Sequence, residues 1–210
     1  MGTQVRIGLE ARKTPIQARS AFTVEAIWEA AIQVLLEVGA ERLTTTRVAA
    51  RAGVSVGTLY QYYPNKQALL FALLERHLTR VVDAVVSVSE AHHGSSLEVM
   101  VEALVTAYVD AKLERPEVSM ALYALSAELD GMAVVRRITS RGRTALAAML
   151  KTVPGVRFED AAFTAMMLLA ALAGATRAVL ETGAPVKMVS ALRRELVVLC
   201  GGYLAKAAQF

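Results

Sequence analysis

The sequence predicts an all-α protein: an N-terminal three-helix domain containing a helix-turn-helix, then a larger helical domain, with about nine helices in total. Apolar residues recur with the helical period along most of the chain, and no segment alternates apolar and polar residues for long enough to indicate a sheet. Clusters of Gly, Pro, Asn and Ser interrupt the pattern at intervals that suit ordinary helices. With 210 residues, 55% of them hydrophobic, the chain can bury a core without a disulfide or a metal.

The first helix is expected to begin near residue 20 and to end at Gly39. Glycine is the usual residue just beyond a helix C-terminus because it adopts positive φ at little cost. One face of this helix is apolar and consists of Ile27, Ala30, Ala31, Val34, Leu35 and Val38.

Two short helices are expected next, joined by a tight turn at Gly53. A run of three threonines, residues 44–46, precedes the first, and a threonine hydroxyl there can accept from an orphan backbone N–H as an N-cap. Ser55 is placed to cap the second, from Val56 to Tyr62 or Tyr63. Small Ala49 allows the two helices to approach closely, and apolar Leu59 packs the second inward. This pattern predicts a helix-turn-helix.

The turn also matches the G-x-S-x-G pattern of serine hydrolases, because residues 53–57 read GVSVG. In those enzymes the serine lies on a sharp turn between a strand and a helix. Here the capped segment before Gly53 predicts a helix, and nothing in the pattern orients a histidine towards Ser55. A hydrolase that uses Ser55 is therefore the least favoured of the functions considered.

A long helix should run from Asn65, its cap, to about Ala91, where a His-His-Gly-Ser-Ser breaker follows. Further breaks at residues 115–116, 130–131, 153–155 and 183–185 divide the remaining chain into about five helices. The uncharged run over residues 161–176 is shorter than the roughly 18 to 20 residues that span a bilayer, so we expect a helix buried on every side.

Residues 44–66, TTTRVAARAGVSVGTLYQYYPNK, closely resemble the DNA-binding segment of TetR-family transcriptional regulators. With the flanking helices the resemblance covers about residues 20–75. It implies a helix-turn-helix domain at 20–66, a connecting helix at 67–91, and a ligand-binding and dimerisation domain at 92–210. The basic residues before it predict a flexible arm at 1–19.

A recognition helix of this kind enters the major groove of double-stranded DNA with its N-terminal residues leading. The resemblance places phosphate contacts on Thr45, Tyr60, Tyr62 and Lys66, and base reading on Thr46, Val56, Gly57 and Thr58. Arg47, Ser55 and Gln61 complete the expected DNA-binding set, Gln61 as a possible partner for adenine. The first 80 residues contain ten Lys and Arg against six Glu, whereas the rest is balanced, so the net charge of +4 lies in this part. Arg6, Arg12, Lys13 and Arg19 form a tail that either enters the minor groove or only aids solubility.

The larger domain is expected to hold a small-molecule pocket. Methionine side chains adapt to varied guests, although any one of them is also an ordinary core residue. The residues predicted to line the pocket are Met100, Tyr108, Met120, Tyr123, Glu128, Met149, Met166 and Arg177.

The last two helices carry small and apolar residues that suit close packing against a second copy. One stripe of the final helix consists of Val189, Leu192, Leu196, Leu199, Cys200 and Tyr203. The family resemblance implies a homodimer through a four-helix interface, formed by about residues 157–183 and 185–207.

These features predict a DNA-binding regulator and no enzyme, most simply a repressor released from a palindromic operator by a small, hydrophobic ligand. A ligand-independent regulator or an activator is the alternative. We expect no cofactor and no metal site, because Cys200 is the single cysteine and no ligand motif occurs. The N-terminal residues lack the apolar core of a secretory signal, so a cytoplasmic protein is expected.

Overall fold

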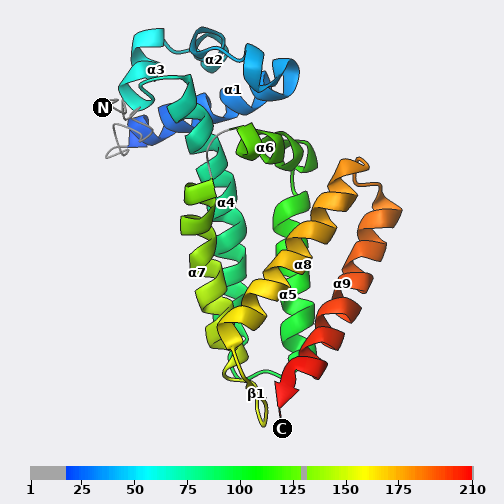
Figure 1. Ribbon diagram of the computed structural model, residues 1–210. Helices are drawn as coiled ribbons and strands as arrows, with labels where there is room; N and C mark the ends of the chain where they lie inside the picture. The colour runs from blue at the N-terminus through cyan, green and yellow to red at the C-terminus, as the bar shows by residue number, and fades with distance from the viewer. Residues whose placement is uncertain (1–17, 129–131, 210) are drawn as a thin grey trace, which may run out of the picture. The chain divides into compact units, whose positions relative to one another are not determined.

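The computed structural model describes residues 18–128 and 132–209, and most of these are helical (Figure 1). Over these residues there are nine helices, as predicted. Their bounds are α1 (Ala18–Arg42), α2 (Thr45–Ala52), α3 (Val56–Tyr62), α4 (Lys66–Ala91), α5 (Leu97–Leu113), α6 (Pro116–Glu128), α7 (Met132–Leu150), α8 (Ala161–Glu181) and α9 (Val186–Ala207). The basic arm expected at 1–19 lies almost wholly outside the described residues.

Gly39 interrupts the first helix. Its backbone has φ 76° and ψ 168°, a conformation that only glycine adopts without strain, so α1 contains a break there and a last turn that runs on to Arg42. The predicted end at Gly39 is therefore correct for the main part of the helix. The extra turn brings Leu43, which is fully buried, into the core.

The chain divides into two compact units, and the division falls inside α4. The first unit contains residues 1–76 and 121–131, and the second contains residues 77–120 and 132–210. In the first unit α1 packs against α2, and α2 against α3. Ile27, Val48 and Leu59, one from each helix, have no exposed surface, so the three helices share one core.

The second unit has its own core, to which α5, α7, α8 and α9 all contribute. Before α8 and after α9, two short strands, β1 (Arg157–Phe158) and β2 (Ala208–Gln209), pair antiparallel with Phe158 opposite Ala208. This ladder joins the two ends of the α8–α9 hairpin. The sequence did not predict it, because two residues are too few to show alternation.

The prediction that α8 is buried on every side is wrong for this single chain. Ala165, Leu168 and Leu172 are buried, whereas Phe163, Met166 and Met167 are 53%, 39% and 41% exposed. The stripe predicted on α9 is divided: Leu192, Leu196 and Cys200 are buried in the unit's own core, and Leu199 is 54% exposed. An apolar composition does not reveal which apolar face a single chain covers.

The most apolar window of α8 is long and hydrophobic enough to cross a membrane, and 39% of it is buried inside the structure. The core helix of a soluble protein passes the same test, so length and composition assign no membrane location.

Candidate nucleic-acid interface

The joint between α2 and α3 is built by backbone geometry that only certain residues allow. Gly53 has φ 66° and ψ 29°, the left-handed conformation that favours glycine. The N–H of Gly53 donates to the oxygen of Ala50 at 3.3 Å, and the N–H of Val54 donates to that of Ala49 at 3.0 Å. This pair of bonds is the Schellman ending of a helix, which satisfies two of its last carbonyls.

The two helices begin at side-chain caps. Thr44 accepts from the N–H of Arg47 at 3.2 Å, and Ser55 accepts from the N–H of Thr58 at 3.0 Å. The Ser55 and Thr58 hydroxyls also lie 2.8 Å apart. Helix α2 precedes the turn, so Ser55 lacks the strand that a nucleophile elbow requires, and its hydroxyl serves as a cap.

The predicted DNA-binding residues differ in accessibility. Most of those at the start of α2 and along α3 reach the surface, which base reading requires. Exposed residues are Thr46, Arg47, Ser55, Gly57, Tyr60 and Gln61; partly exposed are Val56, Thr58 and Lys66; buried are Thr45 and Tyr62.

Two hydroxyl pairs hold the tyrosines predicted to contact phosphate. The Tyr60 hydroxyl lies 3.1 Å from the Thr45 hydroxyl, and the Tyr62 hydroxyl lies 3.1 Å from that of Ser20. Tyr60 is 42% exposed, but Tyr62 is only 9% exposed. Tyr60 and Thr45 therefore offer a joined pair of hydroxyls at the start of α2, whereas Tyr62 ties α3 to α1. The sequence did not reveal Ser20 in this role, since it lies 42 residues from its partner.

Cationic side chains gather around the last turn of α1. Arg47 donates to the carbonyl of Arg42 at 3.4 Å, and Lys66 donates to that of Glu41 at 2.7 Å. Cations near a helix C-terminus satisfy its free carbonyls and complement its dipole. Both side chains are long enough to be presented to a phosphate from these positions.

Arg51, which was not among the predicted residues, is engaged by α1. It contacts Glu37 at 2.6 Å and Gln33 at 3.2 Å. The hydrogen bond from Arg51 lowers the pKa of Glu37. This ion pair is solvent-exposed, so it fixes the orientation of Arg51 more than it stabilises the unit.

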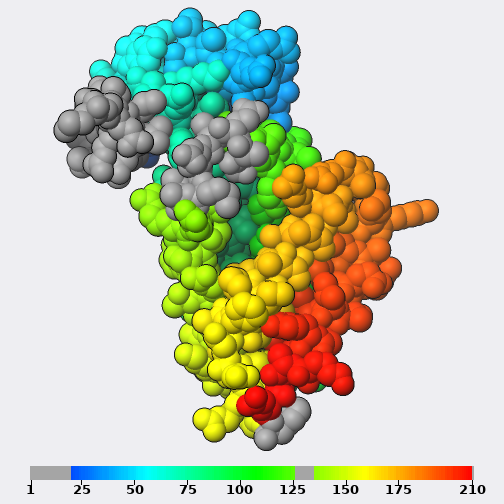
Figure 2. Space-filling model, viewed as in Figure 1, coloured from blue at the N-terminus to red at the C-terminus, as the bar shows by residue number. Residues whose placement is uncertain are grey.

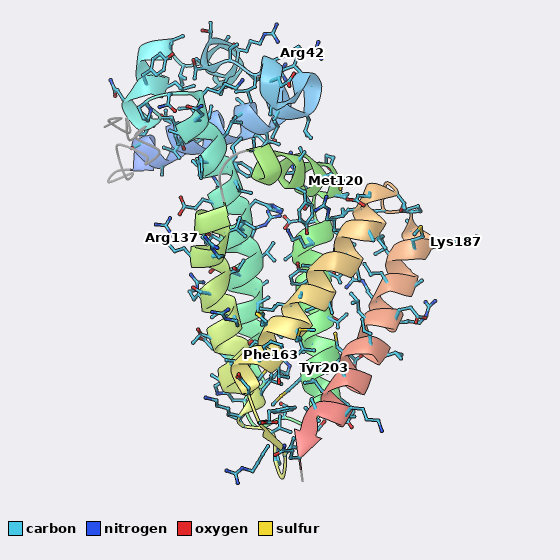
Figure 3. All side chains as sticks on the ribbon, in the orientation of Figure 1. Arg42, Met120, Arg137, Phe163, Lys187 and Tyr203 are labelled. Atoms are coloured by element: carbon cyan, nitrogen blue, oxygen red, sulfur yellow. The ribbon has the colours of Figure 1, made fainter. Side chains whose placement is uncertain are left out.

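The structure does not bring the predicted ligand-binding residues together at one open site. Met100, Tyr108 and Met149 belong to the core of the second unit and are 1%, 6% and 1% exposed. Met166 lies on the uncovered face of α8, and Arg177 pairs with Glu181 at 2.8 Å. Of the residues on α6, Met120 (Figure 3) and Tyr123 are partly exposed, and the side chain of Glu128 lies outside the described residues.

A buried polar cluster in the second unit was missed by sequence reasoning. The Nζ of Lys112 and the Oγ of Ser119 lie 3.5 and 3.4 Å from the Nε2 of His77, and Ser119 donates to the carbonyl of Lys112 at 2.7 Å. All three side chains are at most 6% exposed. Burial, then the charges of Lys112 and Arg80, lowers the pKa of His77 to about 3, and burial lowers that of Lys112 to about 8. The neutral imidazole is thus the stable form in the folded unit.

Two family models match the chain over most of its length. Residues 27–73 match the model of bacterial regulatory proteins of the tetR family, and residues 96–204 match the tetracyclin repressor-like C-terminal domain. The helix-turn-helix and its exposed N-terminal residues define a DNA-binding regulator. The chain belongs to the TetR family of DNA-binding transcriptional regulators.

Curated relatives share mainly the DNA-binding segment. The tetracycline repressor protein class C of Escherichia coli is 49% identical over 55 residues, which is 26% of this chain and 25% of that protein. The nucleoid occlusion factor SlmA of Pasteurella multocida is 51% identical over 53 residues, 23% of this chain and 27% of that protein. The match therefore spans about a quarter of these relatives' length.

Solved structures match nearly the whole chain in fold. A structure from Mesorhizobium loti MAFF303099, assigned to the TetR family, has a TM-score of 0.76 at 17% identity and covers 92% of this chain and all of its own, 100%. FadR from Bacillus subtilis, solved with stearoyl-CoA, has a TM-score of 0.66 at 15% identity, covering 84% of this chain and 97% of that chain. Identities this low support the shared fold alone.

Proposed function

We propose that this regulator is a homodimeric repressor that binds a palindromic operator in the cytoplasm and leaves it when a small molecule binds. The proposal that it binds DNA rests on the exposure of the residues at the start of α3. The residues from Ser55 to Thr58 are wholly or partly exposed, while Leu59 anchors the helix in the core. A helix held this way presents its first turn to the major groove and keeps its orientation.

Within that turn, each side chain has a defined chemistry. Val56 and Thr58 offer methyl groups that can contact thymine, and Gly57 allows the backbone to approach the base edges. A Cβ at residue 57 would have the Ser55 oxygen as a neighbour at 3.7 Å, an ordinary contact, so glycine is not required by the fold. Its absence of a side chain is then best explained by proximity to DNA.

The dimer is proposed to form through about residues 157–183 and 185–207. Helices α8 and α9 contact each other and are visible at the surface of the C-terminal unit, in yellow to red, in Figure 2. Val198 and Leu199 on α9 are 69% and 54% exposed, and Phe163, near the start of α8 in Figure 3, is 53% exposed. Large exposed apolar side chains on two adjoining helices are typical of an interface. A two-fold pair would present two recognition helices about 34 to 36 Å apart, one turn of DNA.

Ligand release requires a site for the ligand. Met100, Tyr108 and Met149 are packed in the core, so a ligand reaches these residues only if the unit opens. The alternative is a regulator, repressor or activator, that responds to no ligand. A coupling free energy of about 1–3 kcal/mol between ligand binding and DNA binding would weaken DNA binding roughly 5- to 150-fold. DNA would then weaken ligand binding by the same factor.

DNA binding is tested with the duplex that lies upstream of the protein's own gene. We expect a footprint with two-fold symmetry, bound by a dimer and resistant to unrelated competitor DNA. Val56→Ser should change the preferred bases, whereas Val99→Ser, a matched change at a 47% exposed valine of the second unit, should not. A footprint without symmetry would contradict the dimeric operator.

The ligand response is tested separately by titrating each compound that shifts the melting temperature, with and without operator. A ligand that induces release must bind more weakly in the presence of operator. Equal affinities for every compound would support the ligand-independent alternative. Transcription from the operator then distinguishes a repressor from an activator.

A further inference from the structure

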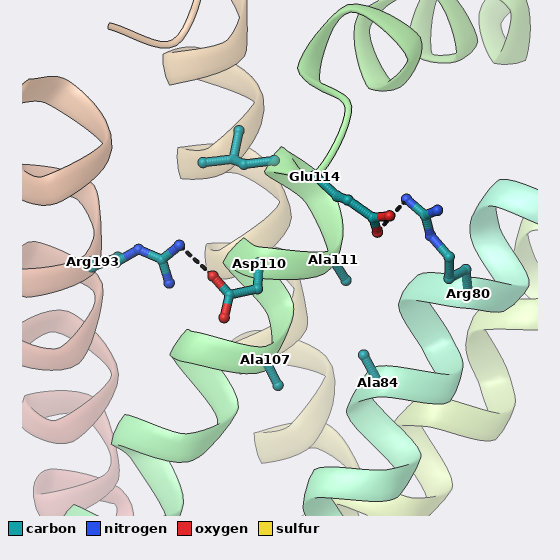
Figure 4. Close-up of a pocket in the computed structure, with 8 residues that line it drawn as sticks. Arg80, Ala84, Ala107, Asp110, Ala111, Glu114 and Arg193 are labelled. Atoms are coloured by element: carbon teal, nitrogen blue, oxygen red, sulfur yellow. Dashed lines mark hydrogen bonds and ion pairs between the residues drawn. The ribbon is translucent and has the colours of Figure 1, made fainter. Parts of the chain in front are cut away.

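A surface pocket of about 480 Å³ lies in the second unit where α5 meets α4 and α9 (Figure 4). Its size falls in the range of small-molecule sites, about 300–1,000 Å³. Charged residues from all three helices line it: Arg80 from α4, Asp110 and Glu114 from α5, and Arg193 from α9. None of the residues that the sequence predicted to bind ligand is among those lining it.

Small side chains provide the room in this pocket. Ala107 and Ala111 lie one turn apart on α5, and Ala84 lies one turn beyond Arg80 on α4. In Figure 4 these alanines face the gap between α5 and α4, beside the Glu114–Arg80 ion pair. The pocket is therefore lined by small apolar side chains as well as by the charged ones.

Both arginines are held by carboxylates in ion pairs that a ligand can displace. Arg80 Nη2 lies 2.8 Å from Glu114, and Arg193 Nη2 lies 2.5 Å from Asp110. The side chains of Glu114 and Asp110 are 59% and 60% exposed. Exposed ion pairs of this kind contribute little net stability, so their exchange for another anion is not strongly opposed.

Arg80 has a donor that this arrangement leaves unused. Its Nε is inaccessible to solvent and has no hydrogen-bond partner among the described residues. Arginine binds a carboxylate most strongly through two parallel N–H donors, and Glu114 is paired with Nη2. A ligand carboxylate that accepts from both Nε and Nη2 would satisfy the buried donor as well as the charge.

The charges that line the pocket are balanced, with Arg80 and Arg193 against Asp110 and Glu114. Both carboxylates already pair with the arginines, and among the described residues that line the pocket the polar atom left without a partner is the Nε donor of Arg80. A carboxylate can accept from that donor, whereas an ammonium group cannot.

We propose that this pocket binds a small organic carboxylate, which Arg80 holds through Nε and Nη2 after releasing Glu114. The inference deepens the proposed ligand response and rests on it for its regulatory meaning. Arg80 lies on α4, which continues into the DNA-binding unit, and Arg193 lies on α9, which carries part of the uncovered apolar face. A ligand that changes the partners of these arginines therefore acts on α4, which leads to the DNA-binding unit, and on α9, which is part of the proposed dimer interface.

Binding is measured directly on the full chain without DNA, by calorimetry at millimolar ligand. The probes are hexanoate, phenylacetate and glutarate, with hexanamide and phenylacetamide as uncharged counterparts and hexylamine as a cation. At least one acid should bind, and its amide and the amine should not. Binding of no acid, or equal binding of an acid and its amide, would overturn the proposal, as would binding of the amine alone.

Variants then locate the site. Arg80→Gln should weaken binding of the acid roughly tenfold or more, because it removes both donors. Glu114→Gln should strengthen it, since the competing carboxylate is lost. Arg143→Gln, an exposed arginine of the same unit that does not line the pocket, should leave it unchanged. Acid binding that is the same in Arg80→Gln and the unmodified protein would place the site elsewhere.

Operator binding, measured on the same samples without ligand, separates this inference from the proposed function. Arg80→Gln should still bind operator. If the unmodified protein binds acids but no DNA, the proposed function fails and the pocket assignment stands. If it binds DNA and no acid, the pocket assignment fails alone.

Discussion

Two polar arrangements, one in each unit, differ in how far they reach along the chain. In the DNA-binding unit, the Thr44 and Ser55 hydroxyls cap helices through backbone N–H groups only three residues away. In the C-terminal unit, His77 meets Lys112 and Ser119 across 35 and 42 residues of chain, and all three are buried. The first arrangement is local and close to solvent, and the second depends on the complete fold.

The units also differ in how they use apolar surface. In the DNA-binding unit Leu59 is fully buried, and Phe22, an apolar side chain that is 77% exposed, lies on α1 and not on α3. In the C-terminal unit, Phe163 and Val198 remain more than half exposed. One unit is therefore suited to a charged partner and the other to an apolar one.

Ionic strength gives the largest predicted contrast between these surfaces. If each subunit engages about four phosphates, operator affinity should fall about 10⁴-fold between 50 and 200 mM salt, with a log–log slope near −7. Self-association through α8 and α9 should change little, because burial of apolar surface is not screened. Sedimentation and anisotropy measured on one salt series test both. Equal salt sensitivity of the two equilibria would contradict the contrast.

The local character of the first unit explains why it could be predicted from sequence. The breaks at Gly39 and Gly53 and the caps at Thr44 and Ser55 are each encoded by one residue and its near neighbours. The sequence could not predict that Tyr62, expected to contact phosphate, is buried, because its hydroxyl pairs with that of Ser20 only once α1 and α3 pack together.

The C-terminal unit could be predicted in helix number but not in its surfaces. An apolar helix such as α8 can bury its residues in its own chain or in a partner, and the sequence does not distinguish Leu172 from Met167. The pocket at Arg80 and Arg193 joins helices far apart in the sequence, so no motif marks it. Side-chain composition alone directed attention to methionines in different places: Met100 and Met149 lie in the core, and Met166 is 39% exposed.

Core truncation should give the next largest effect and shows whether the units are independent. Leu59→Ala should lower the stability of the first unit by about 2–5 kcal/mol and abolish operator binding, because a cavity is left under α3. Leu172→Ala, at an equally buried site of the second unit, should cost a similar amount but act first on dimer formation. Hydrogen exchange of the amides in α2 and α3 measures the effect of Leu59→Ala, and exchange in α8 measures the effect of Leu172→Ala. Uniform acceleration in both variants would mean that the two units unfold as one.

Acid should weaken the C-terminal unit through His77. Its pKa falls from 6.5 in the unfolded chain to about 3 on folding, so between these values the unfolded chain binds more protons. Stability should therefore fall as the pH drops below about 6.5, by up to about 1.4 kcal/mol per pH unit from this residue. Lys112 and Arg80 are the cations acting on it.

Denaturant unfolding from pH 7 to pH 5 measures this dependence. His77→Gln should flatten it, whereas His93→Gln, at an exposed histidine, should leave it steep. If His77→Gln and the unmodified protein lose stability in parallel, carboxylates account for the acid sensitivity and not the buried imidazole.

The smallest predicted effect is on stability and compares two serine caps. Ser55→Ala removes the acceptor for the N–H of Thr58 and should lower stability by about 1 kcal/mol. Ser96→Ala removes the cap of α5, whose oxygen lies 3.5 Å from the N–H of Val99, and should lower stability by no more than that. The consequences should nevertheless differ, because α3 carries the predicted base-reading residues and α5 does not. Ser55→Ala should weaken operator binding by several-fold beyond its effect on stability, since Thr58 also loses its hydroxyl partner at 2.8 Å. The Ser96→Ala variant should bind operator normally once folded.

Ser55→Ala should also leave unchanged any ester hydrolysis that a preparation shows, because the Ser55 hydroxyl is a helix cap. If hydrolysis is lost with this substitution alone, Ser55 is a nucleophile after all.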